Sequence, residues 1–112
     1  MRISYKNRKV EKQCESLKEA KKAFSEKIAK KLLKLVNFIK AAENLESIIK
    51  NPFYKFHKLK GDKEGLYALD IDGRKSSYRL LVAFDGMTSE YIFEEAISIV
   101  SIQIEEVSKH YE

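Results

Sequence analysis

The sequence predicts an α+β fold in which two N-terminal amphipathic helices pack on one face of a small antiparallel β-sheet. Apolar residues recur at helical spacing up to residue 43, and a two-residue alternation typical of strands replaces that spacing after Pro52. An Asp-Gly pair at 72–73, a strong hairpin signal, separates the two clearest strand segments. Helices and strands that segregate along a chain are typical of the α+β class, and such packing leaves one sheet face uncovered.

Length and composition indicate one domain in a reducing setting. The 112 residues suffice for a single domain over 1–112 with its own core, and a hydrophobic content of 44% argues against disorder. Cys14 is the only cysteine, which excludes an internal disulfide and fits the cytoplasm. The stretch MRISYKNRKV lacks the apolar region of a signal peptide, and no apolar run approaches the roughly 20 residues that span a bilayer. We therefore expect a cytoplasmic protein with no membrane partner.

The charge is divided unevenly along the chain. The net charge is +5, to which residues 1–50 contribute +8 and residues 51–112 contribute −3. A basic half favours an anionic partner, such as nucleic acid, an acidic protein or a membrane surface. The alternative is that the lysines only solvate helix faces.

The first half of the chain carries the helical pattern. A strand-like stretch at 3–5 is a candidate edge strand, and residues 8–23 form the first predicted helix. Its apolar face consists of Val10, Cys14, Leu17 and Phe24. Cys14 belongs to that face, and we expect a small core residue rather than a nucleophile because nothing nearby lowers its pKa.

The second predicted helix begins after Ser25, whose hydroxyl suits the N-cap position, and runs to about Glu43. Its apolar stripe consists of Ile28, Leu32, Leu35, Val36 and Ile39. This stripe suits packing on a sheet better than membrane binding. A short helical turn within 44–53 is expected to end at Asn51, because the residue before proline is driven out of the helical region.

The second half of the chain predicts an antiparallel meander. Residues 66–71 and 76–84 are predicted strands joined by the Asp-Gly turn, and 98–107 form the last predicted strand. On the middle strand, one face carries Tyr78, Leu80, Val82 and Phe84, and the other carries Ser77, Arg79, Leu81 and Ala83. The apolar face of the last strand is Val100, Ile102 and Ile104. Residues 89–97 fit either a helical turn or an irregular segment.

The sequence lacks the residues that several kinds of functional site require. His57 and His110 are the only histidines, and no His-x-x-x-His or Cys-x-x-Cys pair occurs, so we expect no metal site. No Gly-x-Gly-x-x-Gly or Walker motif is present, and we expect no cofactor. Neither histidine has the flanking elbow of a serine-based triad.

Metal-free RNA cleavage needs residue types that the chain does have. A base takes the proton of the 2′-hydroxyl, an acid protonates the leaving 5′-oxygen, and cations stabilise the charge on the phosphate. The catalytic candidates are His57, Lys60, Arg79, His110 and Tyr111, and the candidates for RNA phosphate binding are Lys58, Arg74 and Lys75. His110 and Tyr111 follow the last predicted strand, so pairing of that strand with 76–84 brings them to the hairpin.

Each of these candidates has a purely structural alternative. Arg79 can pair with Asp70 across the hairpin, and Tyr78 suits the core better than catalysis. Asp70 and Asp72 suit hairpin and turn positions better than the role of catalytic acid. Tyrosines at 5, 54 and 67 either stack on bases or pack half-buried in the fold.

The stretch HKLKGDKEGLYALDIDGRKSSYRLLVAF, residues 57–84, resembles the hallmark of the HigB-type killer proteins in the RelE/ParE toxin superfamily. That family typically has a histidine before an LKG turn, then a strand, then YRL or WRI on the next strand. Here His57 precedes LKG at 59–61, YALDI follows at 67–71, and YRLLVAF follows at 78–84. The order of elements and a C-terminal His-Tyr extend the resemblance over most of the chain.

The resemblance implies a RelE-like toxin fold and the toxin role in a type II toxin–antitoxin system. Such toxins are usually ribosome-dependent endoribonucleases that cut mRNA and inhibit translation, without a metal or cofactor. Their antitoxin is commonly a helix-turn-helix DNA-binding protein. Carried over to this sequence, His57 is a general base or acid, and Lys60 and Arg79 bind or stabilise phosphate.

The sequence also departs from that family pattern. Its end, SKHYE, replaces the usual Asp-Tyr-His, and Asp70 stands where the first hairpin strand commonly has an arginine, for which Arg74 is the substitute candidate. The segment 87–97 is longer than the family usually has. Three alternatives stay open. One is a superfamily member that binds DNA gyrase or another partner without cleaving RNA, and another is an attenuated RNA-binding toxin. The third is a plain nucleic-acid-binding module that uses the lysines of residues 6–34.

Overall fold

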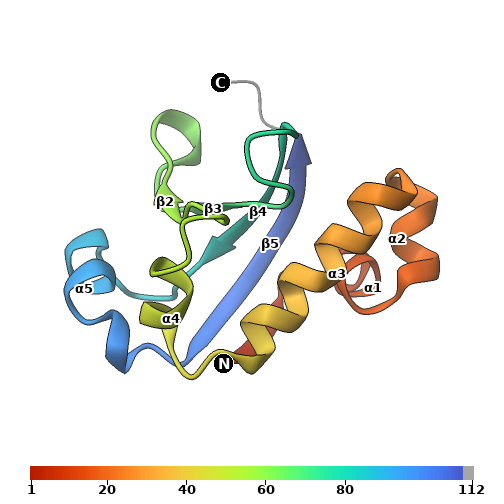
Figure 1. Ribbon diagram of the computed structural model, residues 1–112. Helices are drawn as coiled ribbons and strands as arrows, with labels where there is room; N and C mark the ends of the chain where they lie inside the picture. Colours follow the sequence, from red (N-terminus) through yellow and green to blue (C-terminus); the bar gives the residue numbers. More distant parts are fainter. Residues whose placement is uncertain (110–112) are drawn as a thin grey trace.

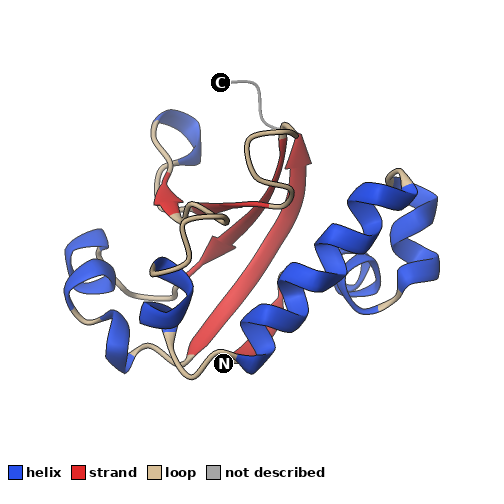
Figure 2. Cartoon of the chain, viewed as in Figure 1, coloured by secondary structure: helices blue, strands red, loops and turns tan. Residues whose placement is uncertain are grey.

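The chain folds around one five-stranded sheet. A computed structural model describes residues 1–109, and the strand order across the sheet is β1-β5-β4-β3-β2 (Figures 1 and 2). The strands are β1 (Arg2–Tyr5), β2 (His57–Lys58), β3 (Tyr67–Asp70), β4 (Tyr78–Ala83) and β5 (Ser101–Lys109). β5 is the longest of them and joins the N-terminal strand to the β4–β3–β2 meander.

The sheet is mixed, which corrects the prediction of an antiparallel sheet. β1 pairs in parallel with β5 and places Ile3 opposite Ile102, whereas the three other strand pairs are antiparallel. The predicted edge strand near residues 3–5 is confirmed. Its direction was not predictable, because side-chain alternation is the same in parallel and antiparallel strands and the two partners lie almost the whole chain apart.

The N-terminal region contains three helices rather than the predicted two. They are α1 (Arg8–Glu15), α2 (Leu17–Ala23) and α3 (Glu26–Ala41). The predicted helix over 8–23 breaks at Ser16, which has extended backbone angles and accepts a hydrogen bond from the Glu19 amide at 3.3 Å. Ser16 and Glu19 have capping-box spacing, so a new helix begins where the old one was expected to continue. Ser25 caps α3 in the same way, as predicted.

The main core lies between the helices and one face of the sheet. Figure 1 shows α3 along the β1 side of the sheet, with α1 and α2 beyond it. Short helices α4 (Leu45–Ile49) and α5 (Ser89–Glu94) lie toward the other side, and α4 ends before Pro52 as predicted. The largest fully buried side chains include Leu32, Leu35 and Ile39 of α3, Ile48 of α4, Leu69 of β3, Leu80 of β4 and Ile104 of β5. Within residues 1–109 no helix is long and apolar enough to cross a membrane.

The opposite sheet face carries a small apolar cluster. Leu59, Ala68 and Leu81 form it, with Leu66 packed against them. The predicted alternation of the middle strand is therefore confirmed, because Leu80 and Val82 lie in the main core and Leu81 lies on the other face. This second face, which we call the open face, remains available for function.

Two predictions for the second half need correction. Val100 is 45% exposed and precedes β5, so it isn't part of the apolar face formed by Ile102 and Ile104. The β3–β4 connection is the longer loop 71–77 rather than a two-residue Asp-Gly turn. The carboxylate of Asp72 lies 3.6 Å from Lys27 and 3.8 Å from Lys31 of α3, and these ion pairs hold the loop against the helix.

Residues 89–97, for which two alternatives were open, are mostly helical. Thr88 caps α5 by accepting a hydrogen bond from the Tyr91 amide at 3.1 Å, and a 3₁₀ turn, η2 (Ala96–Ser98), follows. Ile92 and Ala96 are buried beneath these two elements. The segment is therefore a packed part of the fold that presents its remaining side chains outward.

Cys14 is predicted to be chemically inert in the folded protein. It is 2% exposed in the main core, and burial, reinforced by the neighbouring Glu15 carboxylate, raises the pKa of its thiol to about 12. At pH 8 only about one thiol in 10⁴ is then ionised, and the thiolate is the reactive form. Iodoacetamide should alkylate the native protein far more slowly than the denaturant-unfolded protein. Equal rates in the two states would show that Cys14 is accessible.

Candidate nucleic-acid interface

The open face brings part of the predicted site together. Strand register places His57 opposite Ala68, Ala68 opposite Leu81, and Asp70 opposite Arg79. His57 and Arg79 therefore lie on the same face of the sheet, two strands and two residues apart. Regular strand spacing puts their Cα atoms about 12 Å from each other. That separation suits two groups acting on different parts of one nucleotide step better than a direct contact.

His57 is held in a defined tautomer. Its Nδ1 atom lies 2.8 Å from the Lys55 carbonyl oxygen, and a carbonyl oxygen only accepts hydrogen bonds. Nδ1 therefore carries the hydrogen, which leaves the Nε2 lone pair of the neutral ring free to take a proton. The half-buried ring of His57 thus has the orientation that a general base requires.

The backbone that orients His57 is strained. Lys55 has a φ of 44°, and it is the only non-glycine residue among residues 1–109 with a positive φ. Such a conformation costs on the order of 1–3 kcal/mol and persists only where surrounding contacts enforce it. The amide of Asp70 enforces it here by donating a 2.7 Å hydrogen bond to the Tyr54 carbonyl next to the strained residue.

Arg79 is largely occupied by its own fold. Its Nε atom lies 2.8 Å from Oδ1 of Asp70, and its Nη1 donates to the carbonyl oxygens of Ser76 and Tyr78 at 2.7 and 3.0 Å. The pair with Asp70, one of the two alternatives the sequence allowed, is therefore present. Within residues 1–109, the Nη2 donors alone have no partner, so they are the part of the guanidinium left to bind a phosphate.

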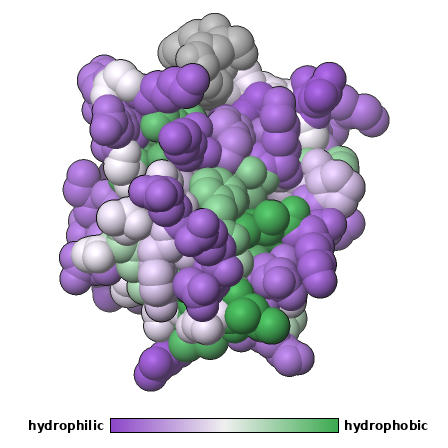
Figure 3. All heavy atoms as spheres, turned by 90° about the vertical axis from the view of Figure 1, so that its left-hand side faces the viewer, coloured by the Kyte–Doolittle hydropathy of each residue, from purple (hydrophilic) through white to green (hydrophobic). Residues whose placement is uncertain are grey.

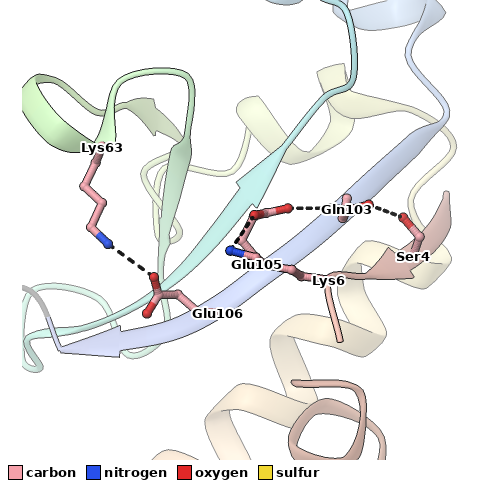
Figure 4. A network of polar contacts seen from close by, with 6 residues as sticks. All are labelled: Ser4, Lys6, Lys63, Gln103, Glu105 and Glu106. Carbon is pink, nitrogen blue, oxygen red and sulfur yellow. Dashed lines mark hydrogen bonds and ion pairs between the residues drawn. The ribbon is translucent and has the colours of Figure 1, made fainter. Parts of the chain in front are cut away.

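The β5 side of the open face pairs its charges internally. Figure 4 shows Lys63 reaching Glu106 and Lys6 reaching Glu105, at 3.2 and 3.8 Å. Gln103 links Glu105 to Ser4 through side-chain hydrogen bonds. Carboxylates at this position repel a polyanion, so an RNA strand is not expected to lie across β5.

The remaining predicted cations separate into two groups beside the hairpin. Lys58 and Lys60 line a hollow of about 510 Å³ together with Tyr67 and residues of the 87–89 segment. Arg74 and Lys75 line a different hollow, of about 500 Å³, at the loop end of the hairpin. The structure thus brings His57 and Arg79 to one face and places the phosphate-binding candidates on its two flanks.

The tyrosines near these hollows are poor acids at neutral pH. Burial raises the pKa of Tyr67, although a side-chain hydrogen bond with Ser89 partly offsets the effect. Burial also raises the pKa of Tyr54. Both belong to the aromatic packing of the core: Tyr67 stacks on Phe56 at 5.4 Å, and Tyr54 lies 5.1 Å from Phe38. Both side chains are buried, at 6% and 4% exposure, so packing in the fold, the structural alternative for these two residues, is what the structure shows.

The structure adds residues near the site that the sequence did not predict. His110 and Tyr111 lie outside the described residues. No group of three or more His, Cys, Asp or Glu side chains within residues 1–109 is arranged to hold a metal ion. Sequence reasoning missed Phe53, Lys55 and Lys31, which line the hollow beside Arg74. A lysine with positive φ has no sequence signature, and the link from Lys31 to the loop is not local.

A second surface is apolar rather than cationic. Tyr91, Phe93, Ile97 and Val100 are between 44% and 60% exposed on α5, η2 and the approach to β5, and we call them the α5–η2 patch. Figure 3, which faces the side of the molecule where α5 lies, shows apolar surface gathered there. The sequence from Leu80 to Ser108 contains six acidic residues and no lysine or arginine. The α5–η2 patch is therefore an apolar surface in an acidic part of the chain.

Comparison with solved structures identifies the fold. The YoeB/ParE toxin from Agrobacterium tumefaciens matches over 99% of this chain and 100% of its own, with a TM-score of 0.52 and 16% identity. The YoeB dimer from Staphylococcus aureus matches over 99% and 98%, with a TM-score of 0.53 and 20% identity. The chain has the fold of these toxins. No protein-family model and no curated protein matches the sequence.

Removing Arg79 is expected to destabilise the protein. Arg79→Ala leaves the Asp70 carboxylate, whose side chain is 3% exposed, without its counter-charge. Breaking a buried pair by deleting one partner costs about 3–5 kcal/mol. Urea unfolding should show this loss, whereas Arg74→Ala, which removes an exposed side chain, should leave the midpoint unchanged. An Arg79→Ala protein of wild-type stability would mean that the pair contributes nothing to folding and that Arg79 is retained for binding alone.

Proposed function

We propose that this protein is the toxin of a type II toxin–antitoxin system and that it inhibits translation by cutting mRNA, as its HigB-type sequence pattern implies. The observation that supports this proposal best is His57 on the open face of a toxin-like fold, with Nδ1 engaged and Nε2 without a partner among residues 1–109. The target is mRNA on the ribosome in the cytoplasm, and no metal ion or cofactor takes part.

The proposed reaction uses the 2′-hydroxyl of the RNA as the nucleophile. Nε2 of His57 takes the proton of the 2′-hydroxyl. The 2′-oxygen then attacks the adjacent phosphorus, and the bond from phosphorus to the 5′-oxygen breaks. Lys60 and the Nη2 group of Arg79 stabilise the charge that develops on the phosphate. His110 or Tyr111 donates the proton to the leaving 5′-oxygen. Lys58, Arg74 and Lys75 hold the neighbouring phosphates of the strand.

One observation favours a second candidate function. Arg79 is committed to Asp70, and the other predicted cations are divided between two flanks of the hairpin. A chain that has lost cleavage needs neither a free arginine nor a single cation cluster. That alternative is a toxin-like protein that acts by binding, either to DNA gyrase or to RNA.

The proposed partner is an antitoxin, commonly a helix-turn-helix protein, and the α5–η2 patch is its proposed docking surface. An exposed apolar patch on a small protein is typical of an interaction site. Acidic residues near this patch include Glu90, Glu94 and Glu95, all exposed. Charge complementarity therefore indicates an amphipathic antitoxin segment that carries lysine or arginine beside its apolar face.

The catalytic assignment predicts loss of toxicity without loss of folding. Induced expression of the wild type in a bacterium should stop amino-acid incorporation, and the His57→Ala/His110→Ala double variant should not. Loss of a general base and acid costs roughly 10²–10⁴-fold each in cleavage rate. Circular dichroism and a thermal melt of the double variant give the folding control.

Other outcomes of the same experiment separate the alternatives. A double variant as toxic as the wild type would overturn the catalytic assignment. DNA damage that precedes the arrest of translation would favour gyrase binding over mRNA cleavage. A wild type without effect on growth would remove the evidence for toxicity in that host, although the fold would be unaffected.

The docking surface predicts variants that keep toxicity and escape neutralisation. A candidate antitoxin is first selected from the same genome by its ability to restore growth. Tyr91→Glu combined with Ile97→Glu, at side chains 44% and 60% exposed, should abolish rescue because the new charges oppose an apolar contact. Ala23→Glu, exposed on α2, is the control for added charge. Full rescue of the double variant would place the antitoxin elsewhere.

A further inference from the structure

The hollow at the loop end of the β3–β4 hairpin has the components of a nucleotide site. Its volume of about 500 Å³ falls within the range of small-molecule sites. It lies between the 52–55 segment, the 70–75 segment and Lys31 of α3. Its lining combines an exposed aromatic ring, several cations and two buried carboxylates, three kinds of group that bind different parts of a nucleotide.

The aromatic ring is Phe53, which is fixed in place yet half exposed. Its side chain is 49% exposed, and its ring meets Tyr54 edge to face at 5.2 Å. Gly73, at a φ of 58°, lies so close that a Cβ there would be 3.2 Å from the ring. A ring positioned by its neighbours and left open to solvent is a ready platform for stacking a base, since every base has a π-face.

The cations at the rim are available to an anion. Lys55, Arg74 and Lys75 are exposed and make no ion pair within residues 1–109. Lys31 lies 3.8 Å from Asp72, beyond hydrogen-bond distance, so its donors are not fully engaged. An arginine and two lysines around one opening suit a phosphate group.

Two carboxylates in the wall supply acceptors. Asp70 and Asp72 are 2% and 5% exposed and are the buried charged residues of the described chain. Oδ1 of Asp70 is enclosed and lies 2.8 Å from Nε of Arg79, so this oxygen belongs to the ion pair and is not an acceptor for a ligand. The lysines beside Asp72 lie at 3.6 and 3.8 Å, which compensates the charge without a close hydrogen bond. A carboxylate accepts hydrogen bonds and donates none, so this wall selects a ligand edge that carries donors.

The geometry points to a guanine nucleotide as the ligand of this hollow. Its base stacks on Phe53, its N1–H and 2-amino group donate to the carboxylate wall, and its phosphate lies among Lys55, Arg74 and Lys75. Guanine alone among the four RNA bases has two adjacent donors on that edge. Uracil presents carbonyl oxygens on either side of one N–H, and adenine presents one amino group beside an acceptor nitrogen. This inference rests on the proposed function, because it names the nucleotide of the RNA substrate that the protein reads.

A direct binding measurement tests the site without a ribosome or cells. The isotopically labelled wild type is titrated with GMP, AMP, UMP and ribose 5-phosphate, and amide shifts of residues 52–55 and 70–75 are followed by NMR. GMP is expected to bind at least about tenfold more tightly than ribose 5-phosphate, because stacking of a base is worth that much. GMP should also bind more tightly than UMP. Equal binding of all four compounds would reduce the hollow to a phosphate site and overturn the inference.

Two variants with a matched control separate stacking from base reading. Phe53→Ala should weaken GMP binding about tenfold, whereas Phe93→Ala, which removes a phenylalanine of similar exposure outside this hollow, should not. Asp72→Asn offers a donor as well as an acceptor, so the preference for GMP over UMP should fall toward one. GMP binding unchanged in Phe53→Ala would contradict the site. If Asp72→Asn does not fold, the ranking of bases by the wild type decides the base assignment alone.

Failure of this inference and failure of the proposed function give different results. A protein that binds GMP here but never inhibits translation keeps the pocket and loses the toxin mechanism. A protein that cuts mRNA but shows no preference for GMP keeps the mechanism and loses the pocket.

Discussion

Two buried carboxylates, Asp70 at the end of β3 and Asp72 in the loop that follows, constrain how the hairpin attaches to the rest of the molecule. A buried charge without compensation costs several kcal/mol, so each carboxylate requires a cation nearby. Asp70 takes Arg79 from the neighbouring strand, and Asp72 takes Lys27 and Lys31 from α3. The first pair fixes the hairpin register and the second ties the loop to the helix. Asp70 and the carbonyl oxygens of Ser76 and Tyr78 together occupy most of the Arg79 guanidinium, so within residues 1–109 Arg79 has only its Nη2 group left for a phosphate.

The position of His57 depends on this anchored connection. The Asp70 amide holds the Tyr54 carbonyl, the chain then turns through the strained Lys55, and the Lys55 carbonyl fixes the histidine ring. Strain at a residue that orients a candidate base is typical of functional sites, where the surrounding structure enforces a geometry the local sequence does not favour. A rigid hairpin thus determines both the tautomer of the histidine and the shape of the hollow at its loop end.

The sequence predicted those features of the fold that depend on residues close together in the chain. The Ser25 cap, the apolar stripe of α3, the alternation of β4 and the edge strand near residue 3 all depend on residues within a few positions of one another. The break at Ser16 was not predicted, because the apolar spacing from Val10 to Phe24 continues across it. The parallel pairing of β1 with β5, the lysine contacts of Asp72 and the positive φ of Lys55 arise from tertiary packing, and short-range sequence reasoning has no access to them. For Arg79 the sequence allowed either phosphate binding or an ion pair with Asp70, and the structure shows the ion pair.

The proposed docking surface lies next to the proposed catalytic histidine. A hollow of about 400 Å³ is lined by His57 and Lys58 on one side and by Glu90 and Phe93 of α5 on the other. A partner that buries Phe93 therefore occupies space next to the histidine, and its basic groups pair with Glu90 and do not occupy the cation sites proposed for the RNA phosphates. The loop-end hollow with Phe53 is lined by none of these α5 residues. A partner bound on α5 would then block the approach to His57 and leave the nucleotide hollow open. Such a partner would inhibit the protein without imitating bound RNA.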